Sequence, residues 1–356
     1  MTLTKVRVVR LAHVVYQHPD LEKALSFLLD FGFVEEHRTA NRVYLRGYGV
    51  QPFVYVAEQS PDDRRHFIAG YWVVESPGEL EKAASNPSAS PILDSEAPGG
   101  GKVVTMTDPN GFTVGFVHGQ KVRESDAVHG HLEQEQDPLS FNTTDNKPRR
   151  GVFRRFKQGP SPVHKLGHYG FVLPASKFQS TLAWYLSLMN LKPSDIVFNP
   201  ETGLDETVFN HIDLGKTYTD HHSLFFAAGP EHAPPHVHHS SYEVFDFDTQ
   251  TLGHDLLRSK GWTNCWGIGR HVLGSQIFDY WFDGSGNIVE HYSDGDLVNE
   301  DTPTSREPAA PNTLFIWGPN IPLAFLSGKV EDAGKELPKP PDAVQAAPAQ
   351  FPVAAA

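Results

Sequence analysis

Residues 166–182 read LGHYGFVLPASKFQSTL, which places a histidine near the start of a strand that leads directly into a helix. The same order occurs at 11–28, where LAHVVYQHPDLEKALSFL passes from a strand pattern to helically spaced apolar residues. Asp20 stands before this helical pattern as the expected N-cap. His13 and His168 therefore occupy matching positions in two halves of one chain.

Each half continues with short β-rich runs and then repeats the order of strand and helix. In the first half this second unit begins at 67–84, FIAGYWVVESPGELEKAA, and closes at 108–119, DPNGFTVGFVHG. In the second half it begins at 237–261, VHHSSYEVFDFDTQTLGHDLLRSKG, and closes at 283–295, DGSGNIVEHYSDG. A β-α-β-β-β unit therefore occurs about four times, and a repeat on this scale constrains the fold more than any single element.

The repeat divides the chain into a first domain at 1–120 and a second domain at 161–330. Residues 121–160 are polar and charged, as expected of a linker. Residues 331–356 are rich in Ala, Pro and Lys, which is typical of a disordered tail. Just before this tail, the apolar stretch FIWGPNIPLAFL at 315–326 is expected to pack on the second domain.

Composition indicates a soluble globular protein with two ordinary domains in 356 residues. No window approaches the roughly 18 uninterrupted apolar residues of a membrane helix. The first residues lack an apolar run long enough for a secretory signal, so we expect a cytoplasmic location and no membrane partner. A net charge of −13 gives a nucleic-acid partner no electrostatic support. The single cysteine, Cys265, excludes an intrachain disulfide and a multi-cysteine metal site.

Three residues of the second half are candidates for a metal centre. His168 lies on the opening strand of this half, His239 on a middle strand and Glu290 on the closing strand. Two imidazoles and a carboxylate can hold Fe(II) or Mn(II) on one face and leave the opposite positions open. Ligands on separate strands of one sheet are also held rigidly, as metal chemistry requires.

The first half supplies an internal comparison for these candidates. The positions that match the three ligands in the first half are His13, Gly70 and Gly115. Only one of the three ligand types remains there. We therefore predict that the first domain is a metal-free structural copy and that the chemistry belongs to the second domain.

The chain resembles the type I extradiol ring-cleaving dioxygenases of the vicinal oxygen chelate superfamily from about residue 8 to residue 320. The motifs that carry the resemblance are LGHYGF, VHHSSYEV and YWFDGSGNIVEHYSDG. In this family the second of the paired histidines is the ligand, which selects His239 over His238. The resemblance, closest to a fungal branch with an extra linker and tail, implies an α+β fold. Each of its two vicinal oxygen chelate domains would pair βαβββ modules in a curved, barrel-like sheet.

The resemblance also implies residues around the metal. The motif DHHSLFF gives His222 as the catalytic histidine, able to accept and return a proton. His271 stands nine residues before Tyr280, and Tyr280 stands ten before Glu290, as in the family. Tyr280 would hydrogen-bond a substrate oxygen and His271 would support the same region. The chain departs from the family in VLGS after His271 and in the extra PEHAPP that precedes the second ligand.

Other residues have plainer interpretations. His13 is expected to be buried and hydrogen-bonded, and Cys265 to be a small buried hydrophobe. The Lys and Arg residues near 147–157 are typical of a solvated linker. The remaining histidines of the cluster are expected to be structural or solvated: His221, His232, His236 and His238.

The activity that the resemblance implies is cleavage of a catechol by O2 at Fe(II), or at Mn(II). The expected partners are a small aromatic diol, O2 and further copies of this chain in a homo-oligomer. A glyoxalase-like isomerase needs no O2, and a non-catalytic protein that binds small aromatics commonly lacks the ligands; both remain open. A hydroxyphenylpyruvate-type dioxygenase has the same ligand types, but its C-terminal helix pattern is not seen here. Nothing in the sequence identifies the catechol.

Overall fold

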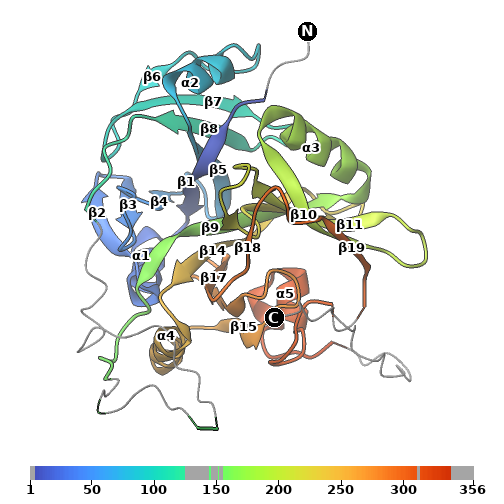
Figure 1. Cartoon of the computed structure of the whole chain (residues 1–356). Coiled ribbons are helices and arrows are strands. Elements are labelled where there is room, and N and C mark those ends of the chain that lie inside the picture. The colour runs from blue at the N-terminus through green and yellow to red at the C-terminus, as the bar shows by residue number, and fades with distance from the viewer. Residues whose placement is uncertain (1–4, 125–143, 146–150, 152–154, 311–312, 338–356) are drawn as a thin grey trace.

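The computed structural model describes residues 5–124, 144–145, 151, 155–310 and 313–337 (Figure 1). The first half contains β1 (Val8–His18), α1 (Leu21–Phe31), β2 (Val34–Arg38), β3 (Arg42–Arg46), β4 (Tyr55–Gln59), β5 (His66–Val74), α2 (Pro77–Ala84), β6 (Leu93–Asp94), β7 (Lys102–Thr107) and β8 (Thr113–His118). The second half contains β9 (Val163–Pro174), α3 (Ala175–Leu188), β10 (Leu191–Phe198), β11 (Asp205–Ile212), β12 (Thr219–Asp220), β13 (Leu224–Gly229), β14 (His236–Val244), α4 (Phe247–Ser259), β15 (Asn264–Arg270), β16 (Ile277–Phe282) and β17 (Ile288–Ser293). After these come β18 (Leu297–Val298), β19 (Ser305–Pro308), α5 (Leu323–Ser327) and a 3-10 turn, η2 (Val330–Asp332).

Each half forms one large mixed sheet, and β12 and β18 pair separately in the second half. The first sheet has the order β2-β3-β4-β1-β5-β8-β7-β6, and the second has the order β15-β16-β17-β14-β9-β13-β11-β10-β19. In both, two βαβββ modules meet through antiparallel pairing of their first strands, β1 with β5 and β9 with β14. Within each module, the first strand also pairs in parallel with the last. The predicted α+β fold with four βαβββ modules is therefore confirmed.

The helix that follows β1 is fixed at both ends. The Asp20 side chain accepts a hydrogen bond from the backbone N–H of Lys23 at 2.9 Å, which confirms the predicted N-cap. At the other end Gly32 adopts a φ of +122°, a conformation that favours glycine. A Cβ at this position would also collide with the backbone carbonyl of Ser161 in the second half. The end of α1 is therefore a close contact between the two halves.

The two halves share one hydrophobic core. Trp72 on β5 donates a hydrogen bond from its indole N–H to the hydroxyl of Tyr169 on β9 at 3.2 Å. His291 on β17 donates from Nε2 to the carbonyl oxygen of Phe31 at 2.7 Å, and the two rings stack 3.5 Å apart. Because β9 and β17 carry predicted ligands, the first half packs against the strands that position the site.

The stretch at 315–326 packs on the second half, as predicted. The indole N–H of Trp266 on β15 donates to the carbonyl oxygen of Pro319 at 2.8 Å, and Phe325 of α5 is buried against this strand and β16. The predicted domain limits stay predictions, and the linker at 121–160 and the tail at 331–356 lie largely outside the described residues. Among the described residues, no helix is both long enough and apolar enough to cross a membrane.

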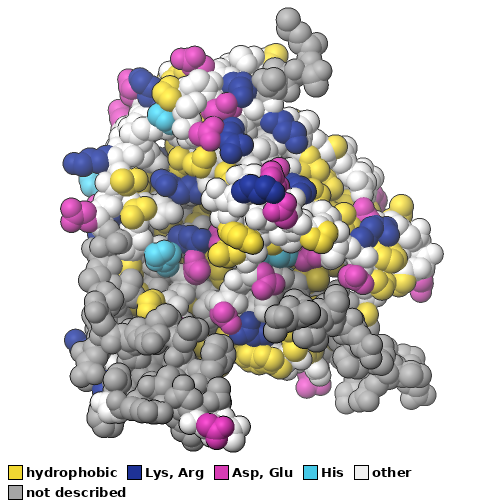
Figure 2. Space-filling model, viewed as in Figure 1, with side chains coloured by type: hydrophobic (Ala, Val, Ile, Leu, Met, Phe, Trp, Pro, Cys, Tyr) yellow, Lys and Arg dark blue, Asp and Glu magenta, His cyan; other side chains and the backbone are white. Residues whose placement is uncertain are grey.

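The face seen in Figure 2 carries acidic and basic side chains that are interspersed with hydrophobic ones. The described residues include ion pairs between such side chains, for example Arg7 with Glu75 at 2.7 Å and Lys165 with Asp220 at 2.7 Å. A phosphate backbone that approached this face would therefore meet carboxylates among the basic side chains.

Acid should destabilise the fold through buried histidines. Burial, reinforced by Arg42, lowers the pKa of His13 to about 3, so this ring stays neutral in the folded protein. The unfolded chain binds a proton at this residue near pH 6.5, so stability falls as the pH drops below that value. Between pH 7 and pH 5 we expect His13 alone to lower the free energy of unfolding by about 2 kcal/mol.

Urea unfolding followed by circular dichroism at the two pH values measures this effect. His13→Phe should lose about 2 kcal/mol of the difference between pH 7 and pH 5. The exposed His37 offers a matched control, and His37→Phe should keep the full difference. Equal pH dependence in both variants would contradict the assignment.

Candidate metal centre

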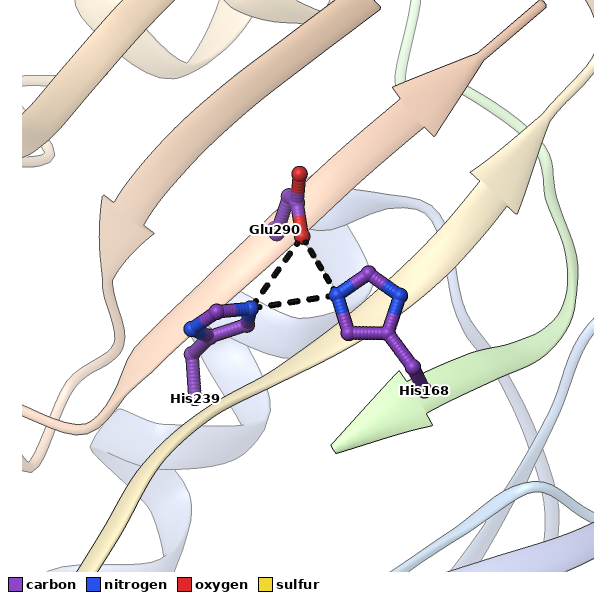
Figure 3. Close-up of side chains that lie close together, drawn as sticks. All are labelled: His168, His239 and Glu290. Atoms are coloured by element: carbon purple, nitrogen blue, oxygen red, sulfur yellow. Dashed lines mark hydrogen bonds and ion pairs between the residues drawn. The ribbon is translucent and has the colours of Figure 1, made fainter. Parts of the chain in front are cut away.

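Three strands bring His168, His239 and Glu290 together (Figure 3). Strand β14 lies between β9 and β17, and its residue Ser241 pairs with His168 on one side and with Glu290 on the other. His239 precedes Ser241 by two residues, so both side chains face the same side of the sheet. The small side chain of Ser241 leaves room between the two flanking ligands.

The ligand atoms are close enough to share one ion. The Nε2 atoms of His168 and His239 lie 3.1 Å apart, and Glu290 Oε2 lies 3.1 Å from the first and 3.4 Å from the second. Ligands about 2.1 Å from one ion and at right angles to one another are separated by about 3 Å. Among the described residues, this is the only group of three histidine, cysteine or acidic side chains that could hold one ion.

The environment of Glu290 fits a bound cation. Its side chain is 0% exposed, and neither carboxylate oxygen has a hydrogen-bond donor among the described residues. A buried carboxylate without a hydrogen bond is costly, and a divalent ion would satisfy it. The two nitrogens and one oxygen suit Fe(II) or Mn(II).

A second histidine fixes the tautomer of His239. His238 Nε2 donates to the carbonyl oxygen of Phe325 at 2.9 Å, which leaves its Nδ1 to accept a hydrogen bond. His239 Nδ1 lies 2.7 Å from this atom and therefore donates to it. The lone pair of His239 is then on Nε2, the atom that faces Glu290. His238 flanks the ligand without joining the triad, as predicted, and burial lowers its pKa to about 3.

His271 and Tyr280 form a hydrogen-bonded pair beside the triad. His271 Nδ1 donates to the carbonyl oxygen of Leu314 at 2.6 Å, so its Nε2 accepts from the Tyr280 hydroxyl at 2.8 Å. The same Nε2 lies 3.9 Å from Glu290 Oε1. Burial lowers the pKa of His271 to about 4 and raises the pKa of Tyr280 well above its usual value. Both side chains are therefore neutral, and the hydroxyl proton of Tyr280 points at His271.

A cavity of about 330 Å³ opens onto these groups. His222 lies in its wall, with its ring centroid 4.1 Å from that of His168. Burial and then the neighbouring histidines lower the pKa of His222 well below its usual value. Most of the remaining wall is apolar: Val172, Phe209, Phe225, Leu273, Leu314 and Phe325. Five of the six predicted site residues, all except Glu290, thus line one cavity that suits an aromatic ring.

Comparisons with known proteins show what the chain is similar to. Residues 165–291 match the model of the Glyoxalase/Bleomycin resistance protein/Dioxygenase superfamily. Metapyrocatechase 2 of Cupriavidus necator is 28% identical over 224 residues, which make up 63% of this chain. The matched part spans 62% of the length of that relative.

Solved structures resemble most of the chain. Homoprotocatechuate 2,3-dioxygenase from Brevibacterium fuscum, in complex with 3,4-dihydroxyphenylacetate, has a TM-score of 0.72 at 16% identity, over 92% of this chain and 94% of that one. The same enzyme from Arthrobacter globiformis has a TM-score of 0.71 at 18% identity, over 95% and 97%. The chain has the two-domain vicinal oxygen chelate fold. A Mn(II)-bound glyoxalase from Novosphingobium aromaticivorans shares it, with a TM-score of 0.69 at 18% identity, over 88% and 92%.

The first vicinal oxygen chelate domain fills the place of the metal with an aromatic ring. His13 pairs across the sheet with Tyr71, which pairs in turn with Gly115, the counterpart of Glu290. The ring of Tyr71 stacks on His13 with centroids 4.2 Å apart, and a Cβ at Gly115 would lie 2.0 Å from that ring. His13 is buried, as predicted, but its Nδ1 has no hydrogen-bond partner among the described residues, so the expected hydrogen bond is wrong for that atom.

The same register corrects one predicted match. Tyr71 is the counterpart of Ser241, because each pairs with the histidine of the opening strand. His239 stands two residues before Ser241, so its counterpart in the first vicinal oxygen chelate domain is Ala69. The prediction of Gly70 was therefore wrong by one residue. The conclusion that a single ligand type remains in this domain is unchanged.

Two residues close to the site, His221 and Asp195, were not among the predicted site residues. His221 is buried and hydrogen-bonded to His222 and to Asp195, which agrees with the predicted structural role, but its contact with His222 was not predicted. His232 and His236 are exposed, as expected for solvated residues. No local pattern marks Asp195, which is one of several carboxylates on strands.

Cys265 is a buried residue of β15, as predicted, and burial raises the pKa of its thiol. A thiol in this state is a poor nucleophile. The structure therefore gives Cys265 a packing role.

Proposed function

We propose that this protein is an extradiol dioxygenase, which cleaves the ring of a catechol beside its two hydroxyl groups and uses O2. The observation that carries the proposal is the buried triad, in which the Glu290 carboxylate is unsatisfied and the two histidine ligands line a largely apolar cavity. The metapyrocatechase relative and the homoprotocatechuate dioxygenase folds support it. His168, His239 and Glu290 would hold Fe(II), and Mn(II) suits the same donors.

The residues around the metal site have different roles in the proposed reaction. Bound Fe(II) would supply sites for both diol oxygens and for O2. His222, which faces the cavity with a lowered pKa, accepts a proton from a diol hydroxyl and returns it when the O–O bond breaks. Tyr280 directs its own proton to His271, so its oxygen can accept a hydrogen bond from the diol. The product is a ring-opened acid in which both atoms of O2 are retained.

The cavity wall narrows the class of catechol. Among the described residues that line the cavity, none is Lys or Arg, and Glu206 adds a carboxylate. A carboxylate on the substrate would therefore be buried without a cation, which is costly. We propose that the substrate is a catechol with an uncharged, apolar substituent.

Oxygen uptake tests the proposed function. Metal-free protein is loaded anaerobically with Fe(II), mixed with catechol or 4-methylcatechol and then exposed to air. We expect one O2 consumed per ring and a yellow ring-cleavage product, while Zn(II)-loaded protein consumes none. No O2 uptake with any catechol would overturn the proposal. Turnover of a glyoxalase-type substrate without O2 would favour the isomerase instead.

The same assay tests the substrate class. We expect kcat/KM for 3,4-dihydroxyphenylacetate to lie at least about 10-fold below that for 4-methylcatechol. Glu206→Gln removes the only carboxylate among the described residues that line the cavity, so it should reduce this discrimination. Equal activity on both substrates in the unmodified protein would contradict an apolar preference.

Three earlier predictions stay predictions. The relatives named above come from Cupriavidus, Brevibacterium, Arthrobacter and Novosphingobium, so they do not bear on a fungal branch. A homo-oligomer and a cytoplasmic location are likewise proposed from the sequence alone. Light scattering of the purified protein would measure the oligomeric state.

A further inference from the structure

A chain of hydrogen bonds leads away from the cavity behind His222. Its Nδ1 lies 3.0 Å from Nδ1 of His221, and Nε2 of His221 lies 2.6 Å from Oδ2 of Asp195. The other carboxylate oxygen of Asp195 accepts a hydrogen bond from the hydroxyl of Ser305. His221 and His222 are at most 5% exposed, so water competes little for these bonds.

The direction of these bonds follows from the acceptor at the end of the chain. Burial would raise the pKa of Asp195, but its hydrogen bonds to His221 and Ser305 lower it overall, so the carboxylate is ionised and only accepts. His221 therefore carries its proton on Nε2. With one proton on each ring, its Nδ1 accepts from Nδ1 of His222, and the lone pair of His222 is left on Nε2.

Two further contacts restrict the position of His221. The hydroxyl of Ser194 donates to the backbone carbonyl of His221 at 2.5 Å. Gly274 adopts a φ of +76°, and a Cβ at this position would lie 2.7 Å from the Nδ1 of His221. Among the described residues, the only hydrogen bond given to the His222 ring is at Nδ1, and His222 lines the cavity.

We infer that Asp195 and His221 are positioning residues that hold His222 in the tautomer whose Nε2 lone pair faces the diol. The inference rests on the proposed function, since it concerns the histidine that takes the diol proton. A neutral imidazole in the opposite tautomer would present an N–H to the diol and could not accept its proton. Two residues outside the cavity therefore decide whether His222 can act as a base.

Asp195→Asn tests this positioning role. The Asn side-chain amide can donate to Nε2 of His221. His221 would then carry its proton on Nδ1 and donate it to Nδ1 of His222, so the proton of His222 would move to Nε2. We expect kcat to fall by roughly 10- to 100-fold, with KM and the metal content per chain unchanged within about two-fold. Adding Asp195→Asn to His222→Ala should cause no further loss, because the two residues act through one group.

A matched control separates this effect from a general loss of packing. Asp30→Asn changes another largely buried carboxylate, which pairs with Lys260 and has no hydrogen bond to His221, so it should keep kcat within about two-fold. Losses that multiply in the double variant Asp195→Asn/His222→Ala would show that Asp195 acts independently of His222 and would overturn the inference.

The tautomer itself can be measured without turnover. Imidazole ¹⁵N chemical shifts of the Zn(II)-loaded protein distinguish protonated from unprotonated nitrogens, and the loss of signals in His222→Ala identifies that ring. We expect the proton on Nδ1 in the unmodified protein and on Nε2 in Asp195→Asn. A proton on Nε2 in the unmodified protein would overturn the inference. Failure of the proposed function would instead show as absent O2 uptake with the expected tautomer present.

Discussion

Glu290→Gln is expected to release the metal and to abolish ring cleavage. Glu290 is the only anionic member of the triad, and both of its oxygens are buried without hydrogen-bond donors. The amide of Gln is a neutral and weaker ligand, so we expect metal affinity to fall by at least about 100-fold. Metal analysis after dialysis measures the loss.

Thermal unfolding gives a second measurement of the same variant. A ligand that binds only the folded state raises its stability, so Fe(II) or Mn(II) should raise the Tm of the unmodified protein. Glu290→Gln should lose this increase. Glu243→Gln is a matched control, because Glu243 lies on β14 and pairs with Lys165 outside the triad. Metal retained at one ion per chain in Glu290→Gln would refute the ligand assignment.

His222→Ala is expected to keep its metal and to lose turnover by roughly 10²- to 10⁴-fold. His222 contacts His168 but lies outside the triad, so its removal leaves all three ligands in place. The diol must then lose its proton to water, and no positioned group returns one when the O–O bond breaks. Stopped-flow absorbance of the yellow product measures the rate, and metal analysis checks occupancy.

The exposed His232 provides the control for this variant, since His232→Ala removes an imidazole that does not line the cavity. Its rate should match that of the unmodified protein. An unchanged rate in His222→Ala would end the role proposed for that histidine and would also leave Asp195 and His221 without a function.

The fold and the triad were predictable because local patterns repeat along the chain. Strand, helix and turn signals recur in the same order in all four modules, and His168 and Glu290 fall within the strongest of these motifs. The one-residue error at Gly70 has a physical cause. The register of a strand is set by hydrogen bonds to its neighbours, and the modules are too different in sequence to reveal that pairing.

The hydrogen-bond chain behind His222 could not be predicted for a related reason. Asp195 lies on β10 and His221 follows β12, so 26 residues separate them in the sequence. A strand places alternate side chains on opposite faces, but it does not reveal which distant group each side chain meets. The sequence therefore identified the residues that face the cavity and missed those that stand behind them.

The tyrosine ring in the first domain restricts the order in which mutations can build a second centre. By the register of the sheet, Ala69→His and Gly115→Glu would supply the two missing ligands beside His13. A side chain at Gly115 meets the ring of Tyr71 at 2.0 Å, so Gly115→Glu is blocked while that ring is present. Tyr71→Ser must come first, and it removes a ring that stacks on His13 and so costs stability. The first mutation toward a chain with two metal centres therefore lowers the stability of the protein, and this cost favours retention of a single centre.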